Sequence, residues 1–594
     1  MSGEGAVRTT ARRVWAPNAE RVDIEVAGRR TPMTRQERGW WSADVREAPP
    51  GSDYGFVLDG REPPLPDPRS GWQPHGVHGL SRAVDHSAFP WTDEGWRPPP
   101  LSSGVIYELH VGTFTDEGTL DGAIGRLDHL ARLGVTHVEL MPVAEFPGSR
   151  GWGYDGVNLY APHHMYGGPD GLKRLVDACH ARGLAVLLDV VYNHLGPAGN
   201  SLGCFGPYFT ERYTTPWGDA VNFDGAGSDE VRAFFLDNAR MWLGEYHGDG
   251  LRIDAVHAIL DLSAKHFLEE LAECVGTLAA QEGRDLVLIA ESDLNDPRIV
   301  WRRERGGYGL DAQWNEDFHH ALHAALTGER QGYYADFGRL ADIAKALREG
   351  FVYDGRFSRY RQHRLGRPAV GLSGHHFVGC LQNHDQVGNR AGGERASRVL
   401  GLGQLQIAAA LVLTAPFVPM LFQGEEWAAS TPFQYFTDHE DPALGRAVAE
   451  GRRREVALFG WHADEAPDPQ ERATFDRSKL DWSELEREPH LRMLDWHRRL
   501  IRLRRKLSPL GDGRLDRLDV AFEEGGWLAM HRGTITVACN LGTARRRVPT
   551  LGDATEVLCT SDPAARPCSG DVDLGPHAVA ILGGEADRDA AGLD

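Results

Sequence analysis

Cysteine is scarce in this chain of 594 residues. Its seven copies are an odd number, lie far apart and include no Cys-x-x-Cys pair. This distribution is typical of reduced thiols, and it argues against both a disulfide framework and a cysteine-based zinc site. The apolar core of a signal peptide is also missing from Met1–Arg13. We therefore expect a cytoplasmic protein.

Long hydrophobic runs and an excess of positive charge are missing as well. The most apolar stretch, Ile407–Phe422, is interrupted by Pro416 and Pro419 and falls short of a membrane span. Asp and Glu outnumber Lys and Arg by 85 to 64, which gives a formal net charge of −21. Such a surface repels phosphate backbones and anionic lipids. We expect no nucleic acid and no membrane as partners, whereas neutral ligands such as sugars are compatible.

Two β-rich segments are expected to flank a longer middle part. Apolar residues alternate at Val22–Val26 and Tyr54–Leu58, and short strands are expected at Trp527–Met530 and Thr534–Asn540. The sequence therefore predicts three domains: a β module over residues 1–95, a catalytic domain over 96–510 and a β-sandwich over 511–594. The tail from Gly584 is expected to be frayed.

The middle part alternates apolar strands with amphipathic helices. Leucines at helical spacing predict one helix from Leu120 that ends at Gly134, and Ser263 is expected to cap a later helix. The absence of hairpin turns implies a parallel sheet covered by helices. The predicted strands are Val105–Leu109, Val135–Leu140, Leu184–Val191, Gly250–Asp254, Leu286–Ala290, Phe377–Gln382 and Val418–Phe422.

About eight strands over some 380 residues favour a (β/α)₈ barrel over an open, doubly wound sheet. An open sheet would need a glycine-rich phosphate loop after its first strand. Val111–Thr113 does not match G-x-G-x-x-G, and Gly167–Gly171 lacks the lysine of a phosphate-binding loop. The fold class expected is therefore α/β, a TIM barrel with a β domain on each side.

The stretch Gly250–His257 carries two opposite charges on a short apolar strand. Alternate side chains of a strand point the same way, so Arg252 and Asp254 should share one face. A guanidinium beside a carboxylate favours the ionised carboxylate. Taken alone, the pair fits a nucleophile and a structural ion pair equally well.

The other predicted strand ends favour one of these two interpretations, because barrel enzymes carry their functional groups at strand ends. These ends carry Asp189, Asn193 and His194, then Glu291, then Asn383, His384 and Asp385. A purely structural barrel has no reason to gather such groups, since buried carboxylates destabilise one another. Glycoside hydrolysis needs a carboxylate on one face of the sugar and a carboxylic acid beside the leaving oxygen.

We therefore predict three catalytic carboxyl groups. Asp254 is the expected nucleophile, kept ionised by Arg252, and Glu291 is the acid and then the base. Asp385 should hold sugar hydroxyls and stabilise the distorted ring.

Histidines and aromatics should complete the sugar site. His194 and His384 are expected to donate to sugar hydroxyls. Trp152, Tyr154 and Trp314 are expected in loop-like positions where aromatic rings can stack on sugars, although core packing is an equal alternative for Trp152.

These residues resemble the sequence signatures of the α-amylase family of glycoside hydrolases. The matching stretches are Asp189–His194, Gly250–Asp254, Glu291 and Asn383–Asp385, in the order of that family. The resemblance implies a retaining mechanism with the three roles above, and a platform role for Tyr154 under the cleaved sugar. Trp15–Asn18 resembles the start of the immunoglobulin-like N-terminal module of branching and debranching members.

A narrower resemblance covers nearly the whole chain. Glu139–Gly148, Asp311–His323, Cys380–Arg390 and Gly424–Trp427 are similar to members that cleave the α-1,4 bond next to the terminal trehalose of malto-oligosyltrehalose. It implies that malto-oligosyltrehalose and related α-glucans are the substrates, and that the polar half of Asp311–His323 binds the trehalose end. The implied lining residues are Arg252, Ile253, Ala255, Val256, His257, Gln313, Trp314, Asn315, Glu316, Asp317, Asn383, His384, Gln386, Val387 and Gly388.

Two other functions compete. A glycogen branching enzyme shares the module, the barrel and the three carboxylates, but passes the glycosyl unit to another glucan instead of water. A barrel that only binds glycans would lack one of the carboxylates, and all three are present.

A metal and a cofactor are not expected. The histidine pairs His163–His164, His319–His320 and His375–His376 are adjacent, so in regular structure each pair points in different directions. Structural calcium near Asn193, found in some α-amylase relatives, is not expected either, because Leu195–Gly227 contains few acids.

Overall fold

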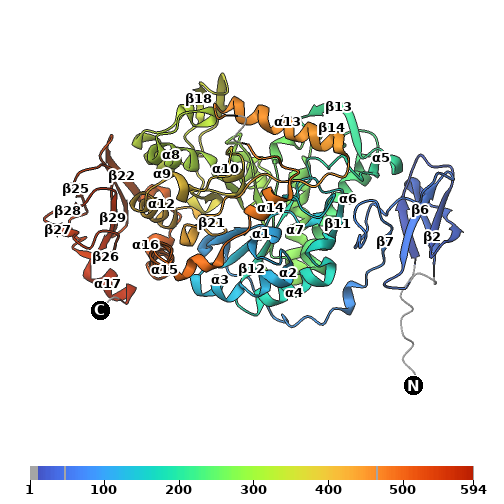
Figure 1. Cartoon of the computed structure of the whole chain (residues 1–594), viewed down its shortest axis with the longest axis horizontal. Helices are drawn as coiled ribbons and strands as arrows, with labels where there is room; N and C mark the ends of the chain where they lie inside the picture. Colours follow the sequence, from blue (N-terminus) through green and yellow to red (C-terminus); the bar gives the residue numbers. More distant parts are fainter. Residues whose placement is uncertain (1–10, 46–48, 463–465, 593–594) are drawn as a thin grey trace.

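Eight parallel strands close into a barrel at the centre of the molecule (Figure 1). The computed structural model describes residues 11–45, 49–462 and 466–592. Around the ring the strands are β8 (Ile106–Leu109), β9 (His137–Leu140), β12 (Ala185–Val190), β15 (Gly250–Ile253), β16 (Val287–Ala290), β17 (Ala312–Trp314), β20 (Phe377–Gly379) and β21 (Val418–Phe422). β21 pairs in parallel with β8, which closes the ring and confirms the predicted (β/α)₈ barrel.

Seven of these strands were expected from the sequence, and most are one to three residues shorter than predicted. β17 was not expected. Helices surround the barrel, and the larger ones are α4 (Gly168–His180), α6 (Ser228–Arg240), α7 (Phe267–Glu282), α8 (Glu316–Thr327), α9 (Leu340–Glu349), α12 (Leu402–Thr414), α13 (Pro442–Leu458) and α15 (His490–Lys506). In the described residues, no helix is both long and apolar enough to cross a membrane.

Two predictions about helices of the middle part are wrong. The single helix expected up to Gly134 is two helices, α2 (Leu120–Ile124) and α3 (Leu127–Leu133), which are separated at Gly125. Gly134 does end α3, because its φ of +98° suits glycine. The helix expected to start at Ser263 begins at Phe267, where the side chain of His266 accepts the Leu268 amide.

Antiparallel hairpins are present as well, contrary to the expectation. They are β10 (Ala144–Glu145) with β11 (Asn158–Pro162), β13 (Phe209–Thr215) with β14 (Gly218–Val221), and β18 (Asp354–Ser358) with β19 (His363–Gly366). Each is an excursion of a loop between barrel elements, so the parallel order of the barrel is unaffected.

Antiparallel sheets lie at opposite ends of the barrel (Figure 1). The N-terminal sheets join β1 (Ala11–Trp15), β5 (Trp40–Asp44) and β4 (Thr34–Arg35), and β3 (Arg29–Pro32), β2 (Val22–Val26), β6 (Asp53–Leu58) and β7 (Ser81–Arg82). The C-terminal sheets join β22 (Leu518–Glu523), β23 (Trp527–Arg532), β24 (Ile535–Asn540), β29 (Ala578–Gly583) and β26 (Glu556–Thr560), and β25 (Arg546–Pro549), β28 (Asp571–Leu574) and β27 (Arg566–Cys568).

The C-terminal sheet is bonded directly to the barrel. The buried guanidinium of Arg532 on β23 donates to the carbonyl oxygens of Thr414 (2.6 Å), Ala415 (3.0 Å) and Leu510 (2.9 Å). The frayed tail predicted from Gly584 is wrong, because α17 (Glu585–Ala591) forms there and the Lys506 ammonium donates to the Ala591 carbonyl.

Candidate active site

The buried Arg252 guanidinium on β15 contacts three carboxylates. Its Nη1 donates to both oxygens of Asp189 at 2.8 Å and to Oδ1 of Asp254 at 2.9 Å. Its Nη2 lies 3.4 Å from Oε2 of Glu291. Burial lowers the pKa of Arg252, but these carboxylates outweigh burial and raise it well above its usual value. Arg252 therefore stays charged and fixes acids from three neighbouring strand ends.

Asp254 lies at the carboxyl end of β15 and is oriented from two sides. Arg252 holds its Oδ1, as the strand pattern predicted, and the Asn193 amide donates to its Oδ2 at 2.7 Å. The same amide donates to the Asp254 carbonyl at 2.9 Å. These bonds hold the carboxylate in one orientation at the rim of the barrel.

Glu291 follows β16 and occupies a different environment. Its Oε2 accepts the backbone amide of Ala255 at 2.6 Å. Burial raises its pKa well above the usual value, and the negative charges of Asp254 and Asp385 add to this effect, while Arg252 opposes it. Glu291 therefore favours its protonated form more than an ordinary glutamate does, whereas Asp254 is ion-paired with Arg252. Two carboxyl groups in such contrasting environments can act as acid and nucleophile.

Asp385 is the most exposed of the three, with 35% of its side chain accessible against 12% for each of the others. It lies in the first turn of α10 (His384–Gly388), which the Asn383 side chain caps. Asp254 and Glu291 thus follow the neighbouring strands β15 and β16, Asp385 lies beyond β20, and Asp385 is open to a ligand.

His384 is held inside the protein on both sides of its ring. Its Nδ1 bonds to Oε1 of Glu108 at 2.5 Å, and its Nε2 bonds to the Tyr154 hydroxyl at 2.8 Å. Burial lowers the pKa of His384, but Asp385 and Glu108 outweigh burial and raise it to about 9. Donation to a sugar hydroxyl would therefore require His384 to exchange one of these bonds.

His194 and Tyr154 complete the wall of the site. The His194 ring bonds to the Asn193 side chain and to the Tyr154 carbonyl, so its nitrogens are engaged as well. Tyr154 donates its hydroxyl to Asp189 at 2.6 Å. Its ring stacks on His384 with centroids 5.2 Å apart, which fixes the platform suggested for Tyr154.

The two tryptophans expected to stack on sugars are buried. Trp152 donates its Nε1 to the Gln434 carbonyl, which agrees with the alternative of core packing. The loop-like position predicted for Trp314 is wrong, because Trp314 is the last residue of β17. The guanidinium carbon of Arg252 lies 4.2 Å from the Trp314 ring centroid, so Trp314 packs against Arg252 and helps to hold it in place.

Within Gln313–Asp317, Glu316 is the residue with side-chain access to the site. Gln313 is fully buried, and Asn315 caps α8 and donates to the Gly350 carbonyl. Asp317 accepts the backbone amides of Val352 and Tyr353 at 2.7 Å. Burial raises the pKa of Glu316 to about 8, helped by Asp293 and Asp385.

Most of the other predicted lining residues are buried and offer no open surface to a ligand. His257 is partly exposed, and its Nδ1 lies 3.8 Å from Oδ1 of Asp293. Gly388 packs against Trp152, since a Cβ at this position would come within 2.0 Å of that ring. The buried members are Ile253, Ala255, Val256, Asn383, Gln386, Val387 and Gly388.

Trp217 was missed by the sequence reasoning. It lies in the turn between β13 and β14, is 49% exposed, and stacks on the His194 ring with centroids 4.3 Å apart and planes 9° apart. The one local signal is the aromatic residue in Pro216-Trp217-Gly218, and nothing in the sequence shows that this turn folds back onto His194.

One side-chain group outside the carboxylate site could hold a metal, namely Glu145, His163 and His164. Both histidines contact the same carboxylate, so the prediction that adjacent histidines point in different directions is wrong for this pair. The reason is local, since the chain turns between the end of β11 and the short helix η4 (His164–Tyr166).

The barrel and its carboxylates define a glycoside hydrolase of the α-amylase type. In agreement, a family model described as alpha amylase, catalytic domain, matches residues 88–201. Carbohydrate-binding module 48 (isoamylase N-terminal domain) matches residues 2–70, and a domain of unknown function, DUF3459, matches residues 513–581.

Individual relatives show which family of glycoside hydrolases the chain resembles. Malto-oligosyltrehalose trehalohydrolase of Rhizobium sp. (strain M-11) is 50% identical over 583 residues, which covers 96% of this chain and 97% of the relative. The Arthrobacter ramosus protein of the same name is 54% identical and covers 91% of this chain and 94% of the relative. The chain belongs to the malto-oligosyltrehalose trehalohydrolase family. A solved α-amylase-like structure from Salmonella typhimurium has a TM-score of 0.88 at 39% identity, covering 96% of this chain and 97% of that one.

Proposed function

We propose that this protein hydrolyses the α-1,4-glucosidic bond next to the terminal trehalose of malto-oligosyltrehalose. The products are trehalose and a shortened malto-oligosaccharide. Family membership supports the reaction, and one observation in the site carries it: a buried Glu291 with a raised pKa lies beside an Asp254 that is paired with Arg252. This contrast is what a retaining glycosidase requires of its acid and its nucleophile.

In the first step, an oxygen of Asp254 attacks the anomeric carbon of the glucose next to trehalose. Glu291 gives its proton to the bridging oxygen, so trehalose leaves as a neutral alcohol and a covalent glycosyl ester remains on Asp254. In the second step, the now ionised Glu291 takes a proton from water, and this water displaces Asp254 from the same carbon. Two inversions give net retention.

The remaining residues orient the sugar and stabilise the transition state. Asp385, the most exposed carboxylate, is placed to accept bonds from sugar hydroxyls while positive charge develops on the ring. Tyr154 offers its ring as the platform beneath the cleaved sugar, and Asp189 and His384 hold its hydroxyl. Glu316 and Trp217 are the accessible polar and aromatic groups with which this site could contact the trehalose end.

Two further expectations remain proposals. The division into 1–95, 96–510 and 511–594 places an α-glucan-binding module before the catalytic barrel, and the match to carbohydrate-binding module 48 supports it. A cytoplasmic location is supported by the seven cysteines, all of which are free thiols in the structure.

Product analysis on maltotriosyl-trehalose tests the function. We expect free trehalose and maltotriose, and much slower attack on a plain malto-oligosaccharide of equal length. Comparable attack on both substrates would indicate a general amylase. New branch points in amylose without free trehalose would indicate the branching enzyme, an alternative that the names of the relatives do not favour.

A further inference from the structure

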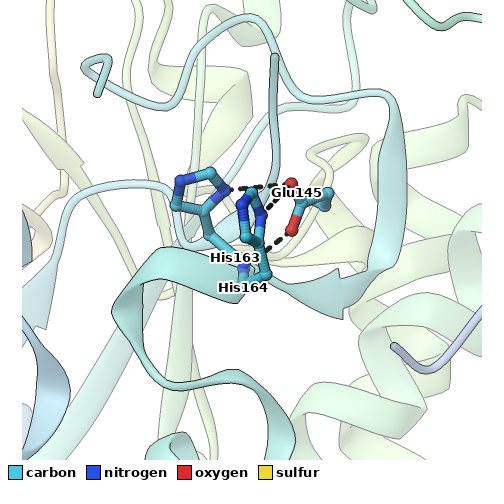
Figure 2. Close-up of side chains that lie close together, drawn as sticks. All are labelled: Glu145, His163 and His164. Atoms are coloured by element: carbon cyan, nitrogen blue, oxygen red, sulfur yellow. Dashed lines mark hydrogen bonds and ion pairs between the residues drawn. The ribbon is translucent and has the colours of Figure 1, made fainter. Parts of the chain in front are cut away.

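The loop that carries Trp152 and Tyr154 into the active site is closed at its base by two histidines and one glutamate (Figure 2). Glu145 ends β10, and His163 directly follows β11, the partner strand of β10. Figure 2 shows both imidazole rings facing the same carboxylate. Nδ1 of His163 lies 3.2 Å from Oε1 of Glu145, and Nδ1 of His164 lies 2.8 Å from the same oxygen.

We propose that Glu145, His163 and His164 bind one zinc ion. Within the part of the chain that the structure describes, this is the one group of at least three His, Cys, Asp or Glu residues whose ligand atoms all lie within 4.8 Å of one another. Two imidazoles and one carboxylate are a zinc ligand set, with water in the fourth position. Calcium and magnesium prefer oxygen ligands, so this set selects against them.

Two of the three spacings between ligand atoms are close to those of a tetrahedral ion, and the third is within 4.8 Å. Zinc bound at about 2.0–2.1 Å places its ligand atoms about 3.3 Å apart. The nitrogen–oxygen distances of 3.2 and 2.8 Å are within about 0.5 Å of that value, so small rotations of the side chains suffice. The carboxylate is already oriented, because its Oε2 accepts the backbone amide of His164 at 2.8 Å.

The cluster is firmly packed on one side and open on the other. Glu145 and His163 are fully buried, and the His163 ring stacks on Phe146 with centroids 3.8 Å apart. The His164 side chain is 23% exposed, which gives an ion and its water ligand a route from solvent. Nε2 of His163 is buried without a hydrogen-bond partner among the described residues.

Zinc would have a structural role here. The β10–β11 ladder is only two residue pairs long, Ala144 with Pro162 and Glu145 with Asn158, and its register shifts between them. Such a ladder constrains the loop of residues 146–157 weakly, whereas three metal bonds would lock its two ends together. Tyr154, which this loop presents to Asp189 and His384, would then be held in position by the ion.

The chain contains a matched control. At Asp93, two histidines also direct Nδ1 to one carboxylate oxygen, with His180 and His247 each at 2.8 Å. These three residues do not belong to the metal-ligand group. The side chain of His247 is 31% exposed, close to the value for His164, so the two substitutions His164→Gln and His247→Gln are comparable in burial.

Zinc binding to the full-length protein tests the proposal. Protein stripped with a chelator is titrated with zinc against a chromogenic competitor, and metal retained after buffer exchange is counted by mass spectrometry. We expect one zinc per chain in the unsubstituted protein and in His247→Gln, and at least tenfold weaker binding in His164→Gln and Glu145→Gln. Circular dichroism checks that each variant is folded.

A second measurement does not depend on the variants. The unsubstituted protein should melt at a temperature that rises with zinc concentration, because an ion that binds only the folded state stabilises it. No tight zinc, no rise in melting temperature, or equal losses in His164→Gln and His247→Gln would each overturn the proposal and leave a hydrogen-bonded cluster. Hydrolytic activity is not the readout, so this result is independent of the proposed function.

Discussion

The substitution Glu291→Gln should separate catalysis from stability. Because burial favours the protonated form of the Glu291 carboxyl group, the neutral glutamine side chain is close to it in shape and in charge. The amide oxygen of glutamine can still accept the Ala255 backbone amide where Oε2 now does. We expect the free energy of unfolding to change by less than about 1 kcal/mol. Loss of a general acid should lower kcat by about 10²–10⁴-fold, or about 3–5 kcal/mol of barrier.

Two assays assign this loss to proton transfer. An α-glycosyl fluoride has a leaving group that needs no proton, so Glu291→Gln should still form the glycosyl-enzyme from it. Azide, an anionic nucleophile that needs no base, should then release the sugar as an α-glycosyl azide. The pH dependence of the hydrolysis rate provides a third test. Only protonated Glu291 can act as the acid, so the wild-type rate should fall as pH rises through its raised pKa, and the variant should lack this fall.

Glu425→Gln is the matched control. Burial raises the pKa of Glu425 to about 8, so its buried carboxyl group also favours the protonated form, and it lies outside the catalytic trio. This control should keep kcat within tenfold of the wild type. The assignment of Glu291 as the acid would be refuted by a kcat within tenfold in Glu291→Gln, or by an unchanged alkaline limb in that variant.

Two further predictions concern binding and stability. The substitution Trp217→Ala should raise KM for malto-oligosyltrehalose about tenfold, roughly 1.4 kcal/mol, with kcat little changed. Trp217→Phe should restore most of the lost affinity. Unaltered steady-state kinetics in both variants would exclude contact between Trp217 and the substrate. In the folded protein His384 has a pKa of about 9, because Asp385 and Glu108 outweigh burial. Its charged form therefore stabilises the folded state in full below its unfolded pKa of about 6.5, and this stabilisation is lost as pH rises through 9. Unfolding midpoints should fall over this window by the equivalent of about 3 kcal/mol, and an equally steep fall in His384→Gln would contradict this.

The barrel was readable from the sequence because most of its strands are apolar and long enough to stand out from the helices between them. β17 was not, because only Ala312–Trp314 pair and its central residue, Gln313, is polar although it is fully buried. A run of three residues with a polar residue at its centre gives no periodic signal. The helix predicted up to Gly134 divides for a related reason, since leucine spacing continues across Gly125 while the backbone does not.

The catalytic carboxylates were predictable because Asp254 and Glu291 directly follow strands and Asp385 lies shortly after one, and parallel strands bring their ends to one rim. The contacts between loops were not. Trp217 reaches His194 through a hairpin whose fold depends on long-range packing, and His163 and His164 converge because the chain leaves β11 in a turn. The burial of Trp314 also depends on tertiary structure, since Arg252 covers it only when β15 and β17 lie in the same barrel.

The position of Arg532 bears on how such chains can be recombined. One guanidinium on the C-terminal sheet serves three carbonyl oxygens that belong to the end of α12, to the turn after it and to the segment before β22. Without this sheet, the oxygens of Thr414 and Leu510 would lose this buried donor, while the Ala415 oxygen would keep its bond from Arg504. The sheet is therefore part of the barrel's own interior, and a chimaera that exchanges it must also exchange the surface of the barrel beneath it.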